Sequence, residues 1–160
     1  MSQGCLDCVQ RSDHAFCDLP PDALAAFDGI KSAQICPKGT VLFREGHAAH
    51  DVFLLCEGRV RLSVCSENGS RMILRVANAG EVLGLSASLA GGCYQVTAET
   101  LDTVRLAAVR RKDLLRFLRQ HGDACYRIVN LLSDDLQIAY DRVRAVGLVR
   151  PRRPRSIRVH

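Results

Sequence analysis

Residues 57–76 read EGRVRLSVCSENGSRMILRV, and this stretch has the pattern of a β-hairpin. From Arg59 to Val64, charged or polar residues alternate with apolar ones, as in a strand with one face buried and the other in water. Asn68-Gly69 then supplies a strong hairpin-turn signal, and residues 71–76 are expected to pair back on the first strand. The stretch therefore predicts antiparallel β-structure.

Further glycines lie on both sides of this hairpin and separate short apolar runs. Many short strands separated by regular turn signals are typical of an all-β sandwich or barrel. The β region is expected to begin near Gln34, with further strands at residues 41–43, 52–55, 95–100 and 103–109. The expected turn glycines are Gly39, Gly46, Gly58, Gly69, Gly80, Gly84 and the pair Gly91-Gly92.

Helical patterns flank the β region. Pro20-Pro21-Asp22 has the composition of a helix N-terminus and predicts a short helix over residues 23–29. After the last strand the apolar spacing becomes helical. It predicts one helix over residues 112–120 and a longer one over residues 124–146, with Asp123 as the N-cap of the longer helix.

The longer helix has two apolar stripes. One keeps spacings of four and three residues in alternation, the pattern that turns a stripe toward a partner helix, and we interpret it as a homodimer seam. A single wide face buried within a monomer is the alternative. The second stripe, formed by Ile128, Leu131 and Ile138, is expected to pack on the barrel. The seam residues are Cys125, Val129, Leu132, Leu136, Ala139, Val143 and Val146.

Composition narrows the class of protein. The chain has 160 residues, of which 48% are apolar, so one domain with a real core is expected. No apolar run approaches the roughly 20 residues that span a bilayer, and the N-terminus lacks a signal peptide, so we expect a cytoplasmic protein with no membrane partner. No Ser-His-Asp set or paired-carboxylate motif stands out. An enzyme is therefore not expected.

The net charge of +5 has a local origin. Residues 148–160 contain five Arg and no acidic residue, and the rest of the chain is formally neutral. The basic character therefore belongs to the C-terminal tail, which we expect to be solvated, and not to a basic face of the folded part. Aromatic residues make up only 5%, which argues against a protein that stacks single-stranded bases.

Six segments, taken in order, resemble the Crp/Fnr family of bacterial transcription regulators (catabolite activator and fumarate–nitrate regulator). The resemblance covers roughly residues 19–148. It implies a mainly β fold with flanking helices, a cyclic-nucleotide-binding-type jelly-roll β-barrel followed by a long C-terminal dimerisation helix. The matching segments are Lys38-Gly39-Thr40, Arg44-Glu45-Gly46, Val52-Phe53-Leu54-Leu55, Glu57-Gly58-Arg59-Val60-Arg61-Leu62, Gly80-Glu81-Val82-Leu83-Gly84-Leu85 and Ala98-Glu99-Thr100.

This resemblance divides the chain into four parts: a Cys-bearing arm (1–18), a jelly-roll sensor domain (19–110), helices including the dimerisation helix (111–147), and a disordered Arg-rich tail (148–160). Family members normally continue into a helix-turn-helix domain. Here Pro151 and Pro154, two prolines within four residues, prevent a stable helix after Gly147. We therefore expect a sensor and dimerisation domain that lacks the DNA-reading domain, binds no specific DNA by itself, and forms heterodimers with full-length regulators.

The resemblance also implies a ligand pocket. In cyclic-nucleotide members a Gly-Glu segment cradles the ribose phosphate, and an Arg followed by a small hydroxyl residue neutralises it; Gly92 and Cys93 stand at those last two positions here. No Arg or Lys lies within residues 76–104. A buried phosphate would lack a cationic partner, so a cyclic nucleotide is not the expected ligand. The candidate pocket residues are Gly80, Glu81, Leu83, Gly84, Leu85, Ser86 and Cys93.

Cys5, Cys8 and Cys17 form a Cys-x2-Cys-x8-Cys pattern that resembles the N-terminal cluster motif of oxygen-sensing family members. The resemblance implies an iron–sulfur cluster and a redox or oxygen signal, with Cys93 or His14 as candidates for the fourth ligand. A Cys3His set also suits zinc, and a mobile arm with unligated thiols is the further alternative. Cys36 and Cys125 are further candidates, of which Cys125 is the poorest because it lies on the seam.

A second class of protein fits the same fold: a small cupin-like metal- or redox-binding jelly-roll protein. A cupin site needs an inward cluster of histidines. Only His47 and His50 lie close together in the sequence, and both fall in an expected turn.

Overall fold

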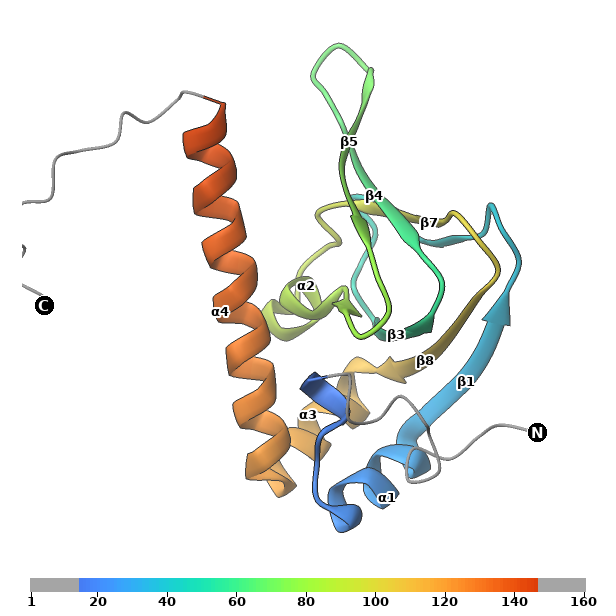
Figure 1. Cartoon of the computed structure of the whole chain (residues 1–160), viewed down its shortest axis with the longest axis vertical. Coiled ribbons are helices and arrows are strands. Elements are labelled where there is room, and N and C mark those ends of the chain that lie inside the picture. The colour runs from blue at the N-terminus through green and yellow to red at the C-terminus, as the bar shows by residue number, and fades with distance from the viewer. Residues whose placement is uncertain (1–14, 147–160) are drawn as a thin grey trace, which may run out of the picture.

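The computed structural model describes residues 15–146. Two four-stranded antiparallel sheets form the body of the molecule, with helices on one side (Figure 1). The first sheet has the order β1-β8-β3-β6, formed by Lys31–Cys36, Val104–Arg110, Asp51–Glu57 and Val82–Leu83. The second has the order β2-β7-β4-β5, formed by Val41–Phe43, Thr97–Thr100, Val60–Cys65 and Arg71–Ala77. The predicted jelly-roll architecture is confirmed.

The hairpin predicted from residues 57–76 joins β4 and β5. The register runs from Val60 opposite Ala77 to Cys65 opposite Arg71. In the turn, the side-chain oxygen of Asn68 accepts a hydrogen bond from the main-chain N–H of Ser70 at 3.2 Å. This local bond explains why an Asn-Gly pair closes the hairpin here.

Several strand boundaries differ from the prediction, and the starts of β1 and β7 show the reason. β1 begins at Lys31, three residues before Gln34, because it pairs with β8 along its whole length, from Lys31 opposite Val109 onward. β7 begins only at Thr97, opposite Ser63 of β4. Pairing with a neighbour, rather than the hydrophobic run itself, sets both ends.

The helices are η3 (Ala15–Cys17), α1 (Pro21–Ile30), α2 (Leu85–Ala90), α3 (Arg111–Gln120) and α4 (Gly122–Ala145). The expected capping role of Asp123 is wrong, because α4 already begins at Gly122 and no side chain caps it. Asp123 lies in the first turn instead, where its charge favours the helix dipole. The short α2 was not predicted, and Gly84 and Gly91, both left-handed, bracket it.

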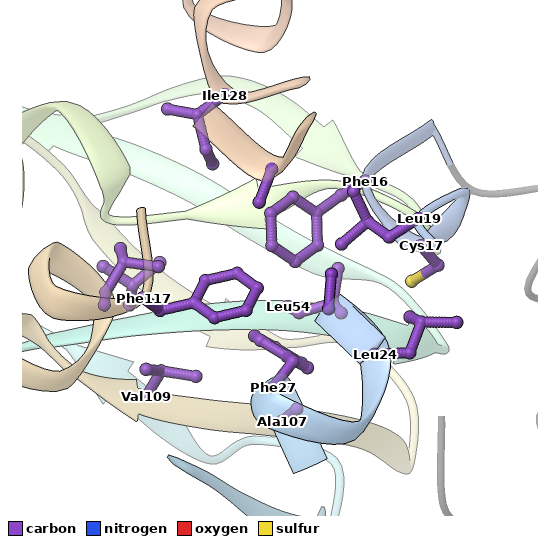
Figure 2. Packing of buried hydrophobic residues seen from close by; sticks show 14 of the residues in the cluster. Phe16, Cys17, Leu19, Leu24, Phe27, Leu54, Ala107, Val109, Phe117 and Ile128 are labelled. Atoms are coloured by element: carbon purple, nitrogen blue, oxygen red, sulfur yellow. The ribbon is translucent and has the colours of Figure 1, made fainter. Parts of the chain in front are cut away.

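Two hydrophobic cores lie on opposite faces of the sheet that contains β3 and β8. Phe53 and Leu55 of β3 point between the two sheets, whereas Leu54 points outward under the helices. The outer core holds η3, α1, α3 and the start of α4 together through three phenylalanines (Figure 2). Phe16 packs edge-on against Phe27, with ring centroids 5.4 Å apart, and Phe27 lies 5.8 Å from Phe117. These contacts fix the base of α4.

Only the base of α4 is anchored in this way. Ala124 and Ile128 are buried, but every residue from position 133 to 146 is exposed. The helix therefore runs alongside the barrel, and the residues of its upper half are exposed (Figure 1). None of the helices within residues 15–146 is long and apolar enough to cross a membrane.

Candidate functional site

A cavity of about 300 Å³ lies between the barrel and α4. Its volume is at the lower end of the range for small-molecule sites, and most of its lining is apolar, as in such sites. The barrel side is lined by Phe43, Leu62, Leu74, Arg75, Val82, Leu83, Gly84, Leu85, Ser86, Ala87, Tyr94, Gln95 and Val96, and the helix side by Asp135, Ile138, Ala139 and Arg142.

Tyr94 is held rigidly in the cavity wall. Its hydroxyl donates a hydrogen bond to the Asp51 carbonyl at 2.7 Å, and the Asp51 N–H donates back to the hydroxyl at 3.2 Å. The ring stacks on Phe43, with centroids 4.1 Å apart and an angle of 18° between the planes. Gly84 also lies close to the ring, since a Cβ there would be 2.9 Å from the Cε1 of Tyr94. Burial raises the pKa of the Tyr94 phenol.

Charged side chains meet at the rim of the cavity. Arg75 Nη1 donates to Glu81 Oε1 at 2.5 Å, and the other carboxylate oxygen of Glu81 accepts the Asn78 N–H at 2.6 Å. Asp135 of α4 lies near this pair: its pKa is raised, first by burial and further by Glu81, while Arg75 opposes the rise. Arg142, two turns further along α4, makes no ion pair with any residue in the described part of the chain.

The structure brings together four of the seven residues that the sequence assigned to the pocket. Leu83, Gly84, Leu85 and Ser86 line the cavity. Gly80 and Glu81 form the turn between β5 and β6, and Glu81 reaches the site only through Arg75. Cys93 is exposed and pairs through its main chain with Ala48, outside the cavity lining.

Sequence reasoning missed the cations of the site. Residues 76–104 contain no Arg or Lys, but Arg75 comes from β5 and Arg142 comes from α4. Strand pairing explains the position of Arg75. Arg75 lies directly opposite Leu62, which faces the barrel interior, so both side chains lie on the same face of the sheet. No local pattern marked Arg142, because helix packing alone brings it to the cavity.

The residues of the expected seam lie along the exposed length of α4. All of them are exposed except Leu132, which is half-buried against the outer core. Val129 and Leu136 show 56% and 54% of their surface. Ala139 also lines the cavity. Of the second stripe, Ile128 is buried and Leu131 partly buried against the outer core, whereas Ile138 lines the cavity.

The cysteines are separated by the fold. Cys17 is buried in the outer core and Cys36 in the barrel core, whereas Cys93 and Cys125 are exposed. Cys5, Cys8 and His14 lie outside the described residues, as does the tail. Within residues 15–146, no group of three or more His, Cys, Asp or Glu side chains is placed to hold a metal ion.

Comparison with known proteins agrees with this geometry. The profile of the family described as "Cyclic nucleotide-binding domain" matches residues 34–121. The anaerobic regulatory protein of Bacillus subtilis (strain 168) is 22% identical over 127 residues, which are 79% of this chain and 53% of that protein. The transcriptional activatory protein AadR of Rhodopseudomonas palustris is 28% identical over 106 residues, 66% of this chain and 43% of that protein.

Among solved structures, the sensor domain of the transcriptional regulator DNR from Pseudomonas aeruginosa superposes with a TM-score of 0.67 at 25% identity, covering 82% of this chain and 88% of that one. The chain belongs to the cyclic nucleotide-binding domain family. Within that family it is a sensor domain of the Crp/Fnr type. It spans about half the length of the curated relatives it matches.

Proposed function

We propose that this chain forms a homodimer through α4 and senses a small molecule in the cavity between the barrel and that helix. One observation carries the proposal: the same helix presents an exposed apolar stripe and one wall of the cavity. Leu136 and Val143 lie on the stripe, and Arg142 lies at the cavity between them in sequence. A ligand that changes how α4 rests on the barrel would therefore change the dimer face.

The exposure of apolar side chains on α4 supports the proposed dimer. Val129, Leu136 and Val143 are among the large apolar side chains that solvent reaches, and they recur on one side of a single helix. Contiguous apolar surface of this kind marks an interaction site more often than a solvated face. Alternating spacing of four and three residues favours a second helix of the same kind as its partner.

The test is the molar mass of the chain in solution, measured by light scattering. Leu136→Glu combined with Val143→Glu places like charges across the proposed seam and should yield monomers. We choose these two residues over Leu132 because Leu132 also supports the outer core of each protomer. Ile35→Glu is the control, since Ile35 is 74% exposed on β1, away from α4 (Figure 1), and should leave the dimer intact. A monomeric wild-type chain at micromolar concentration contradicts the proposal.

A second signal, redox or oxygen, is proposed for the N-terminal arm. The arm with Cys5 and Cys8 leads directly into η3, whose Phe16 and Cys17 are buried in the outer core beside α4. Arg127 of α4 also contacts Asp18, with 3.1 Å between Nη2 and Oδ2. Chemistry at the arm would thus act on the base of the helix that carries the seam.

Anaerobic reconstitution with iron and sulfide tests this second signal. A cluster should give a brown protein that bleaches in air, and replacing Cys5, Cys8 and Cys17 together by Ser should abolish the colour. Cys65→Ser is the matched control, because Cys65 is exposed at the end of β4, far along the chain from the arm. If reconstituted wild-type protein stays colourless, the arm holds no such cluster.

Regulation of transcription is proposed as the outcome of both signals. The curated relatives are regulatory proteins, and a domain of this type would control a DNA-reading module through its dimer face. A heterodimer with a full-length regulator is the second arrangement that the seam allows. The cupin-like alternative is not favoured by any of the relatives, and we propose no enzymatic activity.

A further inference from the structure

We propose that the cavity between the barrel and α4 takes a small aromatic monoanion, such as an arenecarboxylate, rather than a cyclic nucleotide. This inference rests on the proposed sensor function and names the ligand class for the same site. It depends on three features: an aromatic wall, a sealed contact at Gly84, and a single uncommitted cation.

The wall is aromatic and offers little polarity. Phe43 and Tyr94 stack on each other and both line the cavity. The only polar atom of the Tyr94 side chain is already committed to the main chain of Asp51. Leu62 and Leu83 complete an apolar surface around the two rings. Both rings are only 7% exposed and stack on each other, so an aromatic ligand would meet their edges, an arrangement that aromatic pairs also favour.

The contact between Gly84 and Tyr94 closes one part of the cavity wall. The ring of Tyr94 lies so near Gly84 that even a Cβ would be only 2.9 Å from Cε1. No group of a ligand fits between them. Gly92 and Cys93, where an Arg and a hydroxyl residue would be needed, do not line the cavity. A phosphodiester held at Gly92 and Cys93 would find no cationic side chain at those two positions to compensate for its lost hydration.

The rim sets the charge of the ligand. Glu81 already neutralises Arg75, and both oxygens of that carboxylate are engaged. On α4, Arg142 makes no ion pair within the described residues, so its guanidinium is available to an anion. Asp135 stands seven residues earlier, about 10 Å away along the helix axis, and disfavours a second negative charge at its end of the cavity. One anionic group, placed at Arg142, satisfies this arrangement.

Isothermal titration of the full chain with 2-naphthoate tests the inference. We expect saturable binding at one site per chain and weaker binding of the neutral 2-naphthamide. Arg142→Gln should weaken naphthoate by about tenfold or more, as expected for loss of a hydrogen bond to a charged group, and should leave the amide unchanged. Asp135→Asn should strengthen naphthoate about two- to fivefold by removing a repulsion.

Arg144→Gln is the matched control. Arg144 lies on the same helix, pairs with Asp141 at 3.7 Å and does not line the cavity, so its replacement should leave naphthoate binding unchanged. The inference is overturned if naphthoate shows no saturable binding or if cyclic AMP displaces naphthoate. It is also overturned if naphthoate binds Arg142→Gln as tightly as it binds the wild type. Light scattering on the same samples separates the two proposals, because a dimer that fails to bind naphthoate contradicts only the ligand class.

Discussion

The hydroxyl of Tyr94 and the main chain of Asp51 are bonded in both directions: the phenol donates to the carbonyl at 2.7 Å, and the Asp51 N–H donates to the phenol oxygen at 3.2 Å. Ser88 of α2 donates to the same carbonyl at 3.2 Å. Asp51 begins β3, so these bonds tie the cavity wall and α2 to the central sheet. The wall is therefore tied to the barrel, whereas the α4 side of the cavity comes from the exposed half of that helix.

This relationship predicts a loss of stability at alkaline pH. Because the folded-state pKa of Tyr94 is raised above its ordinary value near 10, the neutral phenol is favoured in the folded protein. Its contribution is fully present below that ordinary pKa and is lost as pH rises through the folded-state pKa. The free energy of unfolding, measured by urea denaturation from pH 8 to 11, should fall more steeply for wild type than for Tyr94→Phe. Equal slopes for the two proteins would contradict a raised pKa of Tyr94 in the folded state.

Gly84→Ala should destabilise the fold more than an equivalent change in an open turn. Gly84 has φ of 78° and Gly69 has φ of 84°, so Ala costs about 1–2 kcal/mol of backbone strain at either position. Only at Gly84 does the new Cβ meet Tyr94, whereas nothing lies within 4 Å of it at Gly69. Thermal denaturation should show a further loss of about 1–3 kcal/mol for Gly84→Ala. If Gly84→Ala and Gly69→Ala destabilise the fold equally, the Tyr94 ring moves aside without a cost in stability.

Phe16→Ala should destabilise the helical side by about 3–5 kcal/mol, because Phe16 is only 3% exposed and packs on Phe27. Asp18 lies two residues after Phe16 and forms an ion pair with Arg127. Asp18→Asn removes this pair and should cost no more than about 1 kcal/mol, since the Asp18 side chain is 67% exposed. Chemical denaturation compares the two. A small effect of Phe16→Ala would show that η3 does not anchor the arm to α4.

DNA retention by this chain should be weak and without sequence preference. Five Arg lie within residues 148–160 and the rest of the chain is formally neutral, so phosphate contacts depend on that segment. Electrophoretic mobility shifts should vanish between about 50 and 200 mM salt and on deletion of residues 150–160. A sequence-selective footprint at physiological salt would contradict this prediction.

The amino-acid sequence by itself determined the strands, their turns and the long helix. Alternation in residues 59–64, Asn68-Gly69 and the helical spacing after Arg111 act within a few residues, where backbone geometry and local hydrogen bonds decide the outcome. Leu83, Gly84, Leu85 and Ser86 were found through the resemblance to the Crp/Fnr family and not through a local pattern, and they line the cavity. The unpredicted α2 shows the limit, since six residues of small and apolar character have no periodicity long enough to read.

Only the tertiary structure decided the chemistry of the cavity. Arg75 arrives from β5 by strand pairing, and Asp135 and Arg142 arrive from α4, more than 50 residues further along the chain, because the outer core around Phe16, Phe27 and Phe117 fixes the base of that helix. The same packing leaves the far end of α4 uncovered. Side chains that meet through long-range packing leave no local pattern, so a search confined to residues 76–104 found no cation, and the folded chain supplied two.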